Sequence, residues 1–231
     1  MVLISTKTEE SHNPEEIKRV SDLSLLLMIL IPFVVIVPVI PTNFGFRSVV
    51  VLFIVFLYAI GIYCMRVDRK RFLTGCILAL ISIELFFVSL WQAASILFIL
   101  GEVIFLIFLI YLVQHLVTDY INSHGSFKQI ISYTIILALL GGMACGTGLH
   151  LAGFVNRTGI TDLSSLHSSF GRAITSGILL ILRGGDITVS SPLSGIIIMI
   201  GTLSGFLLLI VSIGKIVVLF ERIRIKEEEI R

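Results

Sequence analysis

Two carboxylates and one short charged motif could do chemistry, because each lies inside or directly beside strongly apolar sequence. Glu84 and Glu102 both fall within the apolar stretch 72–117. Ionisable groups at membrane depth typically bind protons or ions, or pair with one another. The motif Arg-Gly-Gly-Asp, residues 183–186, follows the apolar run 178–182 near the C-terminus. Charged groups in such a place can line an ion path, so their function depends on the helices that carry them.

The composition identifies an integral membrane protein. Of the 231 residues, 56% are apolar and only 14% are charged, and the mean hydropathy is +1.06. Soluble domains carry about 25% charged residues. We therefore expect the lipid bilayer as a partner and no nucleic acid. The three cysteines lie in or beside apolar runs, without a CxxC motif or a histidine at metal spacing, so neither a metal nor another cofactor is expected.

Apolar segments of sufficient length predict six membrane-spanning helices. A span needs about 20 apolar residues, and the stretch 72–117 would measure about 69 Å as a single helix. It must therefore form a hairpin, and Trp91 and Gln92 mark its turn because both suit the membrane interface. The predicted fold is an all-α integral membrane protein with spans at 23–40, 48–65, 72–92, 93–117, 130–151 and 193–220.

The distribution of basic residues gives the expected orientation. Lysines and arginines gather before the first span, between spans two and three, before span five and after span six. The positive-inside rule therefore places both termini in the cytoplasm, in a multi-pass protein of the cell membrane. Segment 1–22 is then cytoplasmic, and 221–231 is a cytoplasmic tail that we expect to extend the last helix into solvent.

The connection between spans five and six contains a helical segment too short to cross the membrane. Residues 168–182 would cover about 22 Å as a helix. Gly184 and Gly185 permit a tight return, and Asp186 favours water, so we expect segment 168–186 to enter and leave the membrane on one side. Non-helical backbone at that depth must be buried in protein or line a water-filled cavity. A short interfacial helix followed by a plain surface turn is the alternative.

The order of these elements resembles the pore module of the potassium-channel superfamily over about residues 130–220. In that family a pore helix precedes the strand Thr-Val-Gly-Tyr-Gly-Asp, and a Pro-Leu pair opens the inner helix. The corresponding residues here are Ile181, Leu182, Arg183, Gly184, Gly185 and Asp186, followed by Pro192 and Leu193. The resemblance implies a pore-like domain at 128–220 after a four-helix domain at 23–117. It also implies a homotetramer and inorganic ions as the transported species.

Three filter positions depart from the family's pattern. Arg183 stands where the family has its first filter glycine, Ile181 where it has threonine, and Gly184 where it has tyrosine. Stacked carbonyls replace the hydration shell of potassium in such filters, and a non-glycine residue is costly at the first glycine's backbone angle. The first four helices also lack a voltage sensor's spaced arginines. We therefore expect a voltage-insensitive cation channel of atypical or weak selectivity, or a related scaffold or subunit that does not conduct.

Glu84 and Glu102 each lie nine residues from position 93, so a hairpin turning there places them at similar depth on adjacent helices. Two ionised carboxylates would repel, so we expect one to be protonated or to share a proton with the other. Either a proton- or cation-coupled role or a single neutral, hydrogen-bonded acid fits this expectation. His115 and His150 have no partner at ligand spacing and are expected to be structural.

The last span carries small residues and one cation. Gly201, Gly205 and Gly214 suit close helix packing or a gating bend. Lys215 is expected to extend toward the cytoplasmic surface. No enzyme is expected, because the Gly-x-Ser-Gly motif of six-span intramembrane proteases does not occur in the sequence.

Overall fold

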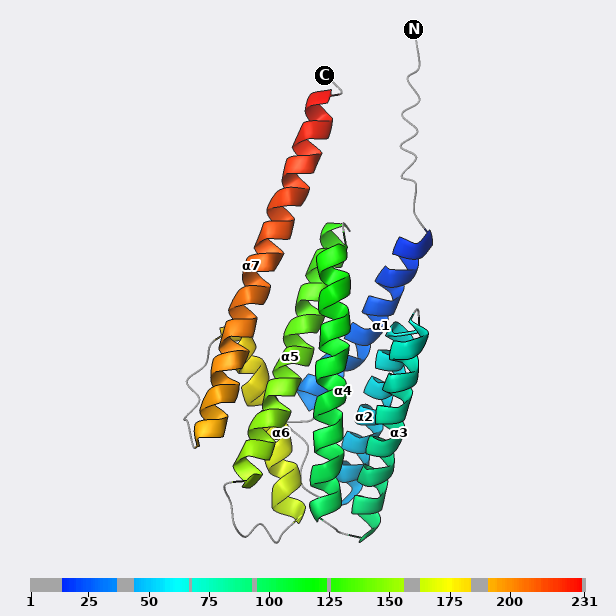
Figure 1. Cartoon of the computed structure of the whole chain (residues 1–231), viewed down its shortest axis with the longest axis vertical. Coiled ribbons are helices and arrows are strands. Elements are labelled where there is room, and N and C mark those ends of the chain that lie inside the picture. The colour runs from blue at the N-terminus through cyan, green and yellow to red at the C-terminus, as the bar shows by residue number, and fades with distance from the viewer. Residues whose placement is uncertain are drawn as a thin grey trace.

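The computed structural model describes residues 14–36, 44–66, 68–92, 95–123, 126–155, 163–183 and 191–229. This part of the chain folds into seven α-helices that pack side by side (Figure 1). The helices are α1 (Pro14–Ile36), α2 (Phe44–Cys64), α3 (Arg69–Gln92), α4 (Ser95–Asn122), α5 (Phe127–Val155), α6 (Leu163–Arg183) and α7 (Pro192–Glu229).

Four of these helices are long and apolar enough to cross a membrane. Their apolar stretches are Arg69–Ser89, Ile96–Asn122, Phe127–Gly153 and Pro192–Ile225, in α3, α4, α5 and α7. Helices α1 and α2 contain shorter apolar stretches, Leu23–Ile36 and Val50–Cys64. Each predicted span thus overlaps a helix, and the all-helical fold agrees with an all-α membrane protein.

The predicted hairpin turn falls between α3 and α4. Helix α3 ends at Gln92 and α4 begins at Ser95, while the side chain of Trp91 is 94% exposed. The two helices pack against each other, and the Ser82 hydroxyl donates to the Gly101 carbonyl at 3.0 Å. An exposed tryptophan at the end of an apolar helix is typical of the membrane interface.

Helices α4 and α5 form the middle of the bundle, with α1–α3 on one side and α6 and α7 on the other (Figure 1). Buried aromatic rings fill the contact between α2 and α4. The ring centre of Tyr58 is 4.4 Å from that of Phe108 and 5.7 Å from that of Phe105. Gly61 makes room for this packing, because a β-carbon there would lie 2.8 Å from Phe108.

Helix α6 packs backbone to backbone against α5. Gly142 and Gly146, one turn apart on α5, face Gly177 of α6. A β-carbon on Gly142 would lie 2.5 Å from the Cα of Ile178, and one on Gly146 would lie 2.5 Å from the carbonyl oxygen of Ala173. A β-carbon on Gly177 would collide with the backbone of both glycines. Only glycine fits here, and small residues allow the same close approach in other membrane helix pairs.

The C-terminal end of α6 lies halfway along its neighbours. Ile181 contacts Gly141, in the middle of α5, and Gly205 of α7. Gly205 comes 13 residues after Pro192, so α7 begins about 20 Å from this level. Near the opposite end of α6, Phe170 meets His150 in the C-terminal part of α5. Helix α6 therefore runs antiparallel to α5, along the C-terminal half of α5.

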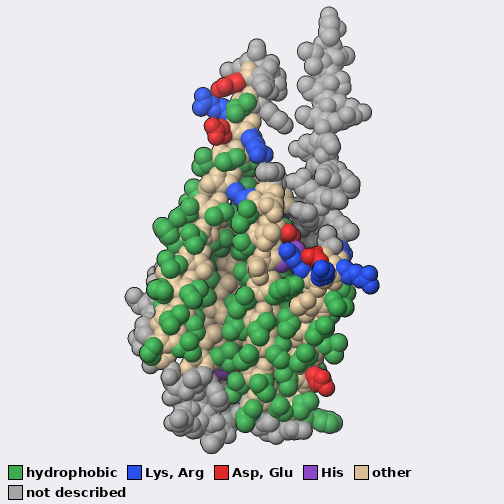
Figure 2. All heavy atoms as spheres, viewed as in Figure 1, with side chains coloured by type: hydrophobic (Ala, Val, Ile, Leu, Met, Phe, Trp, Pro, Cys, Tyr) green, Lys and Arg blue, Asp and Glu red, His purple; other side chains and the backbone are tan. Residues whose placement is uncertain are grey.

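Helix α7 is the most exposed element. It has 38 residues, or about 57 Å of helix, and it projects beyond the bundle (Figure 1). Only 11% of its apolar stretch is buried, against 56% for α5. Figure 2 shows hydrophobic side chains along the sides of the molecule and lysines and arginines gathered toward the end where α7 projects. A helix that is apolar all round must be covered by lipid or protein.

Gly177→Ala is expected to lower the melting temperature of the detergent-solubilised protein, because the added methyl group forces the backbones of α5 and α6 apart. Overpacking of this kind costs about 1–3 kcal/mol. Gly214→Ala is the matched control, since no heavy atom lies within 4 Å of a β-carbon at that helical position. Equal melting curves for the two variants, followed by circular dichroism, would contradict the α5–α6 contact.

Candidate functional site

A carboxylate and an imidazole lie buried between α4 and α5. Glu102 on α4 is 0% exposed, and its Oε2 atom is 2.8 Å from Nδ1 of His150 on α5, which is also buried. The Oε1 atom of Glu102 makes no hydrogen bond within the described part of the chain. We call these two residues the Glu102–His150 pair.

A series of aromatic rings begins beside His150 and extends to α3. Phe170 of α6 is edge-on to the His150 ring, with centres 5.6 Å apart, and Phe98 of α4 lies 6.3 Å from Phe170. Phe86 of α3 extends the cluster, with its ring centre 5.3 Å from that of Phe98. Because these rings keep the surroundings apolar, the electrostatic interaction within the pair is stronger than it would be in water. The pair and its rings connect four helices.

The geometry allows the Glu102–His150 pair to hold a proton. The pair has no net charge when the carboxyl is protonated beside neutral imidazole, and also when both groups are charged. Removing one proton from either arrangement, or adding one, leaves a net charge among apolar side chains, which is costly. The pair is therefore a candidate proton site as well as a tie between α4 and α5.

The predicted sharing of a proton between Glu84 and Glu102 is wrong. Glu84 is exposed on α3, whereas Ser82, two residues earlier, is buried and bonds to α4. Two residues rotate a helical side chain by about 200°, so Glu84 points away from α4. The partner of Glu102 is His150. The sequence could not reveal this pair, because spacing rules apply to residues of one helix and these two residues lie on different helices.

Three of the six predicted filter residues belong to α6. Ile181, Leu182 and Arg183 are helical and end that helix, so the extended strand that the resemblance implied for them is wrong. The apolar run before them continues as helix instead. Ile181 packs between α5 and α7, and Leu182 is exposed. Gly184, Gly185 and Asp186 lie outside the described residues.

Two of the three glycines singled out in the last span touch α6. A β-carbon on Gly201 would lie 2.6 Å from Cδ2 of Leu180, and one on Gly205 would collide with the carbonyl of Ile181. Gly214 has no such neighbour within 4 Å. Helix α7 continues through all three positions. Gly201 and Gly205 therefore serve the packing of α6 against α7.

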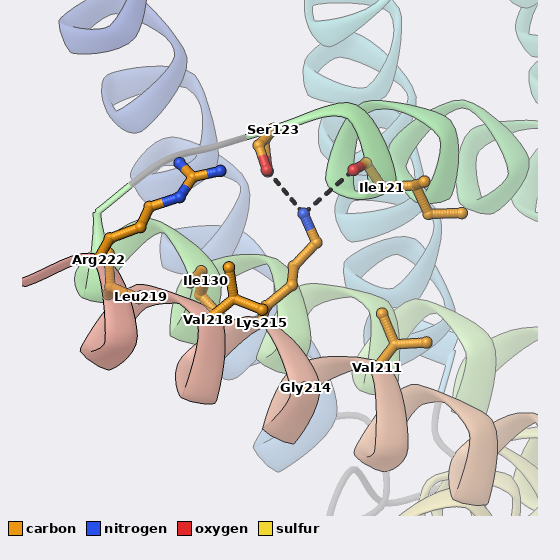
Figure 3. Close-up of a pocket in the computed structure, with 9 residues that line it drawn as sticks. All are labelled: Ile121, Ser123, Ile130, Val211, Gly214, Lys215, Val218, Leu219 and Arg222. Atoms are coloured by element: carbon orange, nitrogen blue, oxygen red, sulfur yellow. Dashed lines mark hydrogen bonds between the residues drawn. The ribbon is translucent and has the colours of Figure 1, made fainter. Parts of the chain in front are cut away.

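Lys215 of α7 caps the C-terminal end of α4 (Figure 3). Its Nζ donates to the carbonyl oxygens of Ser123 at 2.7 Å and Ile121 at 3.2 Å, and it lies 4.9 Å from the ring centre of Tyr120. The last carbonyls of a helix lack intrahelical partners and carry partial negative charge, so a lysine suits this place. The sequence predicted an extended lysine but not the helix end that it caps.

A second charged cluster lies where α3 begins. Asp68 accepts the backbone N–H of Lys70 at 3.0 Å, and its other carboxylate oxygen is 3.2 Å from Nε of Arg71. Nη1 of Arg71 lies 2.6 Å from Nδ1 of the buried His115 on α4, whose Nε2 is 3.7 Å from Asp119. The cluster therefore ties the start of α3 to the C-terminal half of α4. His115, like His150, has an interhelical partner that the sequence did not indicate.

No protein-family model, curated protein or solved structure matches the chain. The resemblance to a potassium-channel pore module therefore rests on the sequence motif alone. Among the described residues, no group of three or more histidine, cysteine or acidic side chains is placed to hold a metal ion.

A double-mutant cycle on Glu102→Leu and His150→Leu should show strong coupling. Removing one partner of a buried pair costs about 3–5 kcal/mol because the other polar group stays buried. The double variant should therefore lose less free energy of unfolding than the two single variants added together, by at least about 1 kcal/mol. The measurement is reversible denaturation in mixed micelles.

Glu84→Leu is the control for this cycle, because it removes a carboxylate of the same hairpin from an exposed position. Its free energy of unfolding should change by no more than about 0.5 kcal/mol. Strict additivity of Glu102→Leu and His150→Leu would show that the two side chains do not interact.

Proposed function

We propose that the chain is the subunit of a tetrameric channel for cations, in which α6 and the residues after it form a re-entrant pore segment. One observation carries the proposal: the last turn of α6 lies beside Gly141 and Gly205, about 20 Å along α7 from its start at Pro192. A chain that returns over this distance at membrane depth needs protein or a water-filled cavity around its backbone. A pore at the centre of several subunits supplies both.

Several copies are needed, because one half-length helix cannot enclose a pore. Helix α7 supports assembly: it packs against α5 and α6 and exposes large apolar side chains along most of its length. Closed rings of identical subunits are the usual solution for such a surface. The proposed number, four, comes from the resemblance to potassium channels, and α7 would then be the inner helix.

The proposed pore is weakly selective and does not use a potassium-type filter. The backbone of Ile181, Leu182 and Arg183 is helical, and so it does not present the stacked carbonyls that replace a potassium ion's hydration shell. The C-terminal end of a helix carries about half a negative charge, which favours cations near the end of α6. The proposal assigns the ring of Arg183 charges to this level of the pore, and Asp186 is the nearest acid in the sequence to compensate them.

The second candidate is a membrane scaffold or channel subunit that does not conduct. The observation that favours it is the tight packing of α6 against α5 and α7 of its own chain. Such packing fixes α6 whether or not an ion path runs beside it.

Purified protein in a planar bilayer under a potassium chloride gradient should pass current, with a reversal potential of cation sign. Arg183→Gly should increase the cation current, because it removes a ring of positive charges that repel cations. Two unit charges of the same sign about 8 Å apart repel each other by about 2 kcal/mol at an effective dielectric constant of about 20. Asp186→Asn should shift the reversal potential toward that of chloride. If the parent protein crosslinks as a tetramer but passes no current, the scaffold is favoured. A monomer or dimer in lipid would exclude both tetrameric forms.

The proposed orientation has both termini in the cytoplasm and the connection before α6 outside. In a variant whose three native cysteines are replaced by alanine, a cysteine at Ser164, where that connection enters α6, should react with an impermeant thiol reagent in intact cells. A cysteine at Lys70, an exposed residue in the first turn of α3, should react only after the membrane is opened. The reverse pattern would invert the topology.

A further inference from the structure

Two hollows follow one another along α7, between this helix and α4 and α5. The larger measures about 540 Å³. The smaller, whose lining residues are drawn in Figure 3, measures about 370 Å³. Ten residues of α7 line the two hollows, and most of them are spaced three or four positions apart, so both hollows open on one face of α7. They are Ile197, Ile200, Ser204, Leu208, Val211, Gly214, Lys215, Val218, Leu219 and Arg222.

A polar bridge holds the three helices together between the two hollows. The Tyr120 hydroxyl of α4 donates to Oγ of Ser212 on α7 at 3.0 Å, and that Oγ lies 2.8 Å from Oγ1 of Thr134 on α5. The bridge fixes the spacing of α4 and α7 above the surface of α5. We call the two hollows and the face of α7 between them the α7 groove.

The two ends of the α7 groove differ in chemistry. The larger hollow is lined mainly by aliphatic side chains, among them Leu106, Ile110 and Ile200. The smaller hollow carries Lys215 and Arg222 (Figure 3). The Lys215 ammonium has three N–H donors, of which two bond to the carbonyls of Ile121 and Ser123 at the end of α4.

Arg222 provides a second positive charge at this end of the α7 groove. Its side chain is exposed, and it makes no ion pair with any residue that the structure describes. By contrast Arg224, two positions further along α7, pairs with Glu228 at 3.0 Å. The basic end of the groove also lies toward the end of the molecule where the charged side chains gather (Figure 2).

We propose that the α7 groove binds an anionic phospholipid. Lys215 and Arg222 hold the phosphate, and one acyl chain follows α7 over Val211 and Leu208 into the larger hollow. From Lys215 to Ile200 the groove measures about 22 Å along the helix, which covers the roughly 15 Å of hydrocarbon in one leaflet. Basic residues beside apolar helices attract anionic lipids in the same way elsewhere.

The polar bridge favours a lipid chain over a helix of a second copy. An α-helix is a rigid rod about 10 Å wide, and the hydrogen bond between Tyr120 and Ser212 joins α4 to α7 between the two hollows, so a single helix does not fit into both. An acyl chain is thinner and flexible enough to pass the Tyr120–Ser212 bridge. A phosphate without a chain would occupy the basic end only and leave the apolar hollow uncovered.

Native mass spectrometry of the full-length protein can count bound lipids. We expect phosphatidylglycerol to be retained in preference to phosphatidylcholine with the same acyl chains, and glycerol phosphate, which has no chain, not to be retained. Arg222→Gln should reduce phosphatidylglycerol retention about fivefold, the effect of one basic residue near an anionic lipid. Arg224→Gln is the matched control, because it removes the same charge from the same helix outside the groove, and it should have little effect.

Blocking the apolar hollow separates a bound lipid from simple charge attraction. Ser204→Trp should displace the acyl chain and lower phosphatidylglycerol retention by at least fivefold while Arg222 remains. Because Ser204 is exposed on α7, the fold should survive, and Ser204→Leu offers a smaller block if it does not. Equal losses in the Arg222→Gln and Arg224→Gln variants would overturn the proposal. So would full retention by folded Ser204 variants, retention of glycerol phosphate, or crosslinks between two copies through the groove.

Discussion

The depth of α6 depends on one constraint, the direct contact of its backbone with α5 and α7. Gly142 and Gly146 meet Gly177 where no β-carbon fits, and Gly205 meets the carbonyl of Ile181 in the same way. Side chains elsewhere on these helices can adjust to one another, but backbone atoms cannot. The contact therefore fixes the level at which α6 ends relative to α5 and α7.

Polar contacts complete what the glycine contacts begin. In lipid, apolar side chains gain little by leaving their surroundings for another helix, so packing and interhelical hydrogen bonds decide which helices associate. The Glu102–His150 pair joins α4 to α5, Lys215 joins α7 to the end of α4, and Arg71 joins the start of α3 to His115. Each contact joins residues that are distant in sequence. Each therefore limits the rotation of one helix about its axis relative to the other.

The helices could be predicted from the sequence, but most of their partners could not. Each apolar segment of the sequence overlaps a helix, and four of these helices are long and apolar enough to cross a membrane. Trp91 marked the α3–α4 turn. The predicted pairing of Glu84 with Glu102 failed because it was based only on their similar depth along α3 and α4. Whether the Glu84 carboxylate faces α4 depends on the rotation of α3 about its axis, which the depth does not give. The filter alignment failed at Ile181–Arg183 because the motif was matched through its glycines and Asp186, whereas the apolar run before them continues as helix.

The close approach of α5, α6 and α7 also determines how related chains can differ from this one. Positions on the exposed faces of α3 and α7 need only remain apolar, so many residues satisfy them and overall identity can decay quickly. A pair of glycines one turn apart on α5, one glycine in the second half of α6 and one in the middle of α7 have no substitute that preserves the arrangement. A distant homologue should therefore be recognisable by these glycines in this order, long after the rest of its sequence has ceased to align.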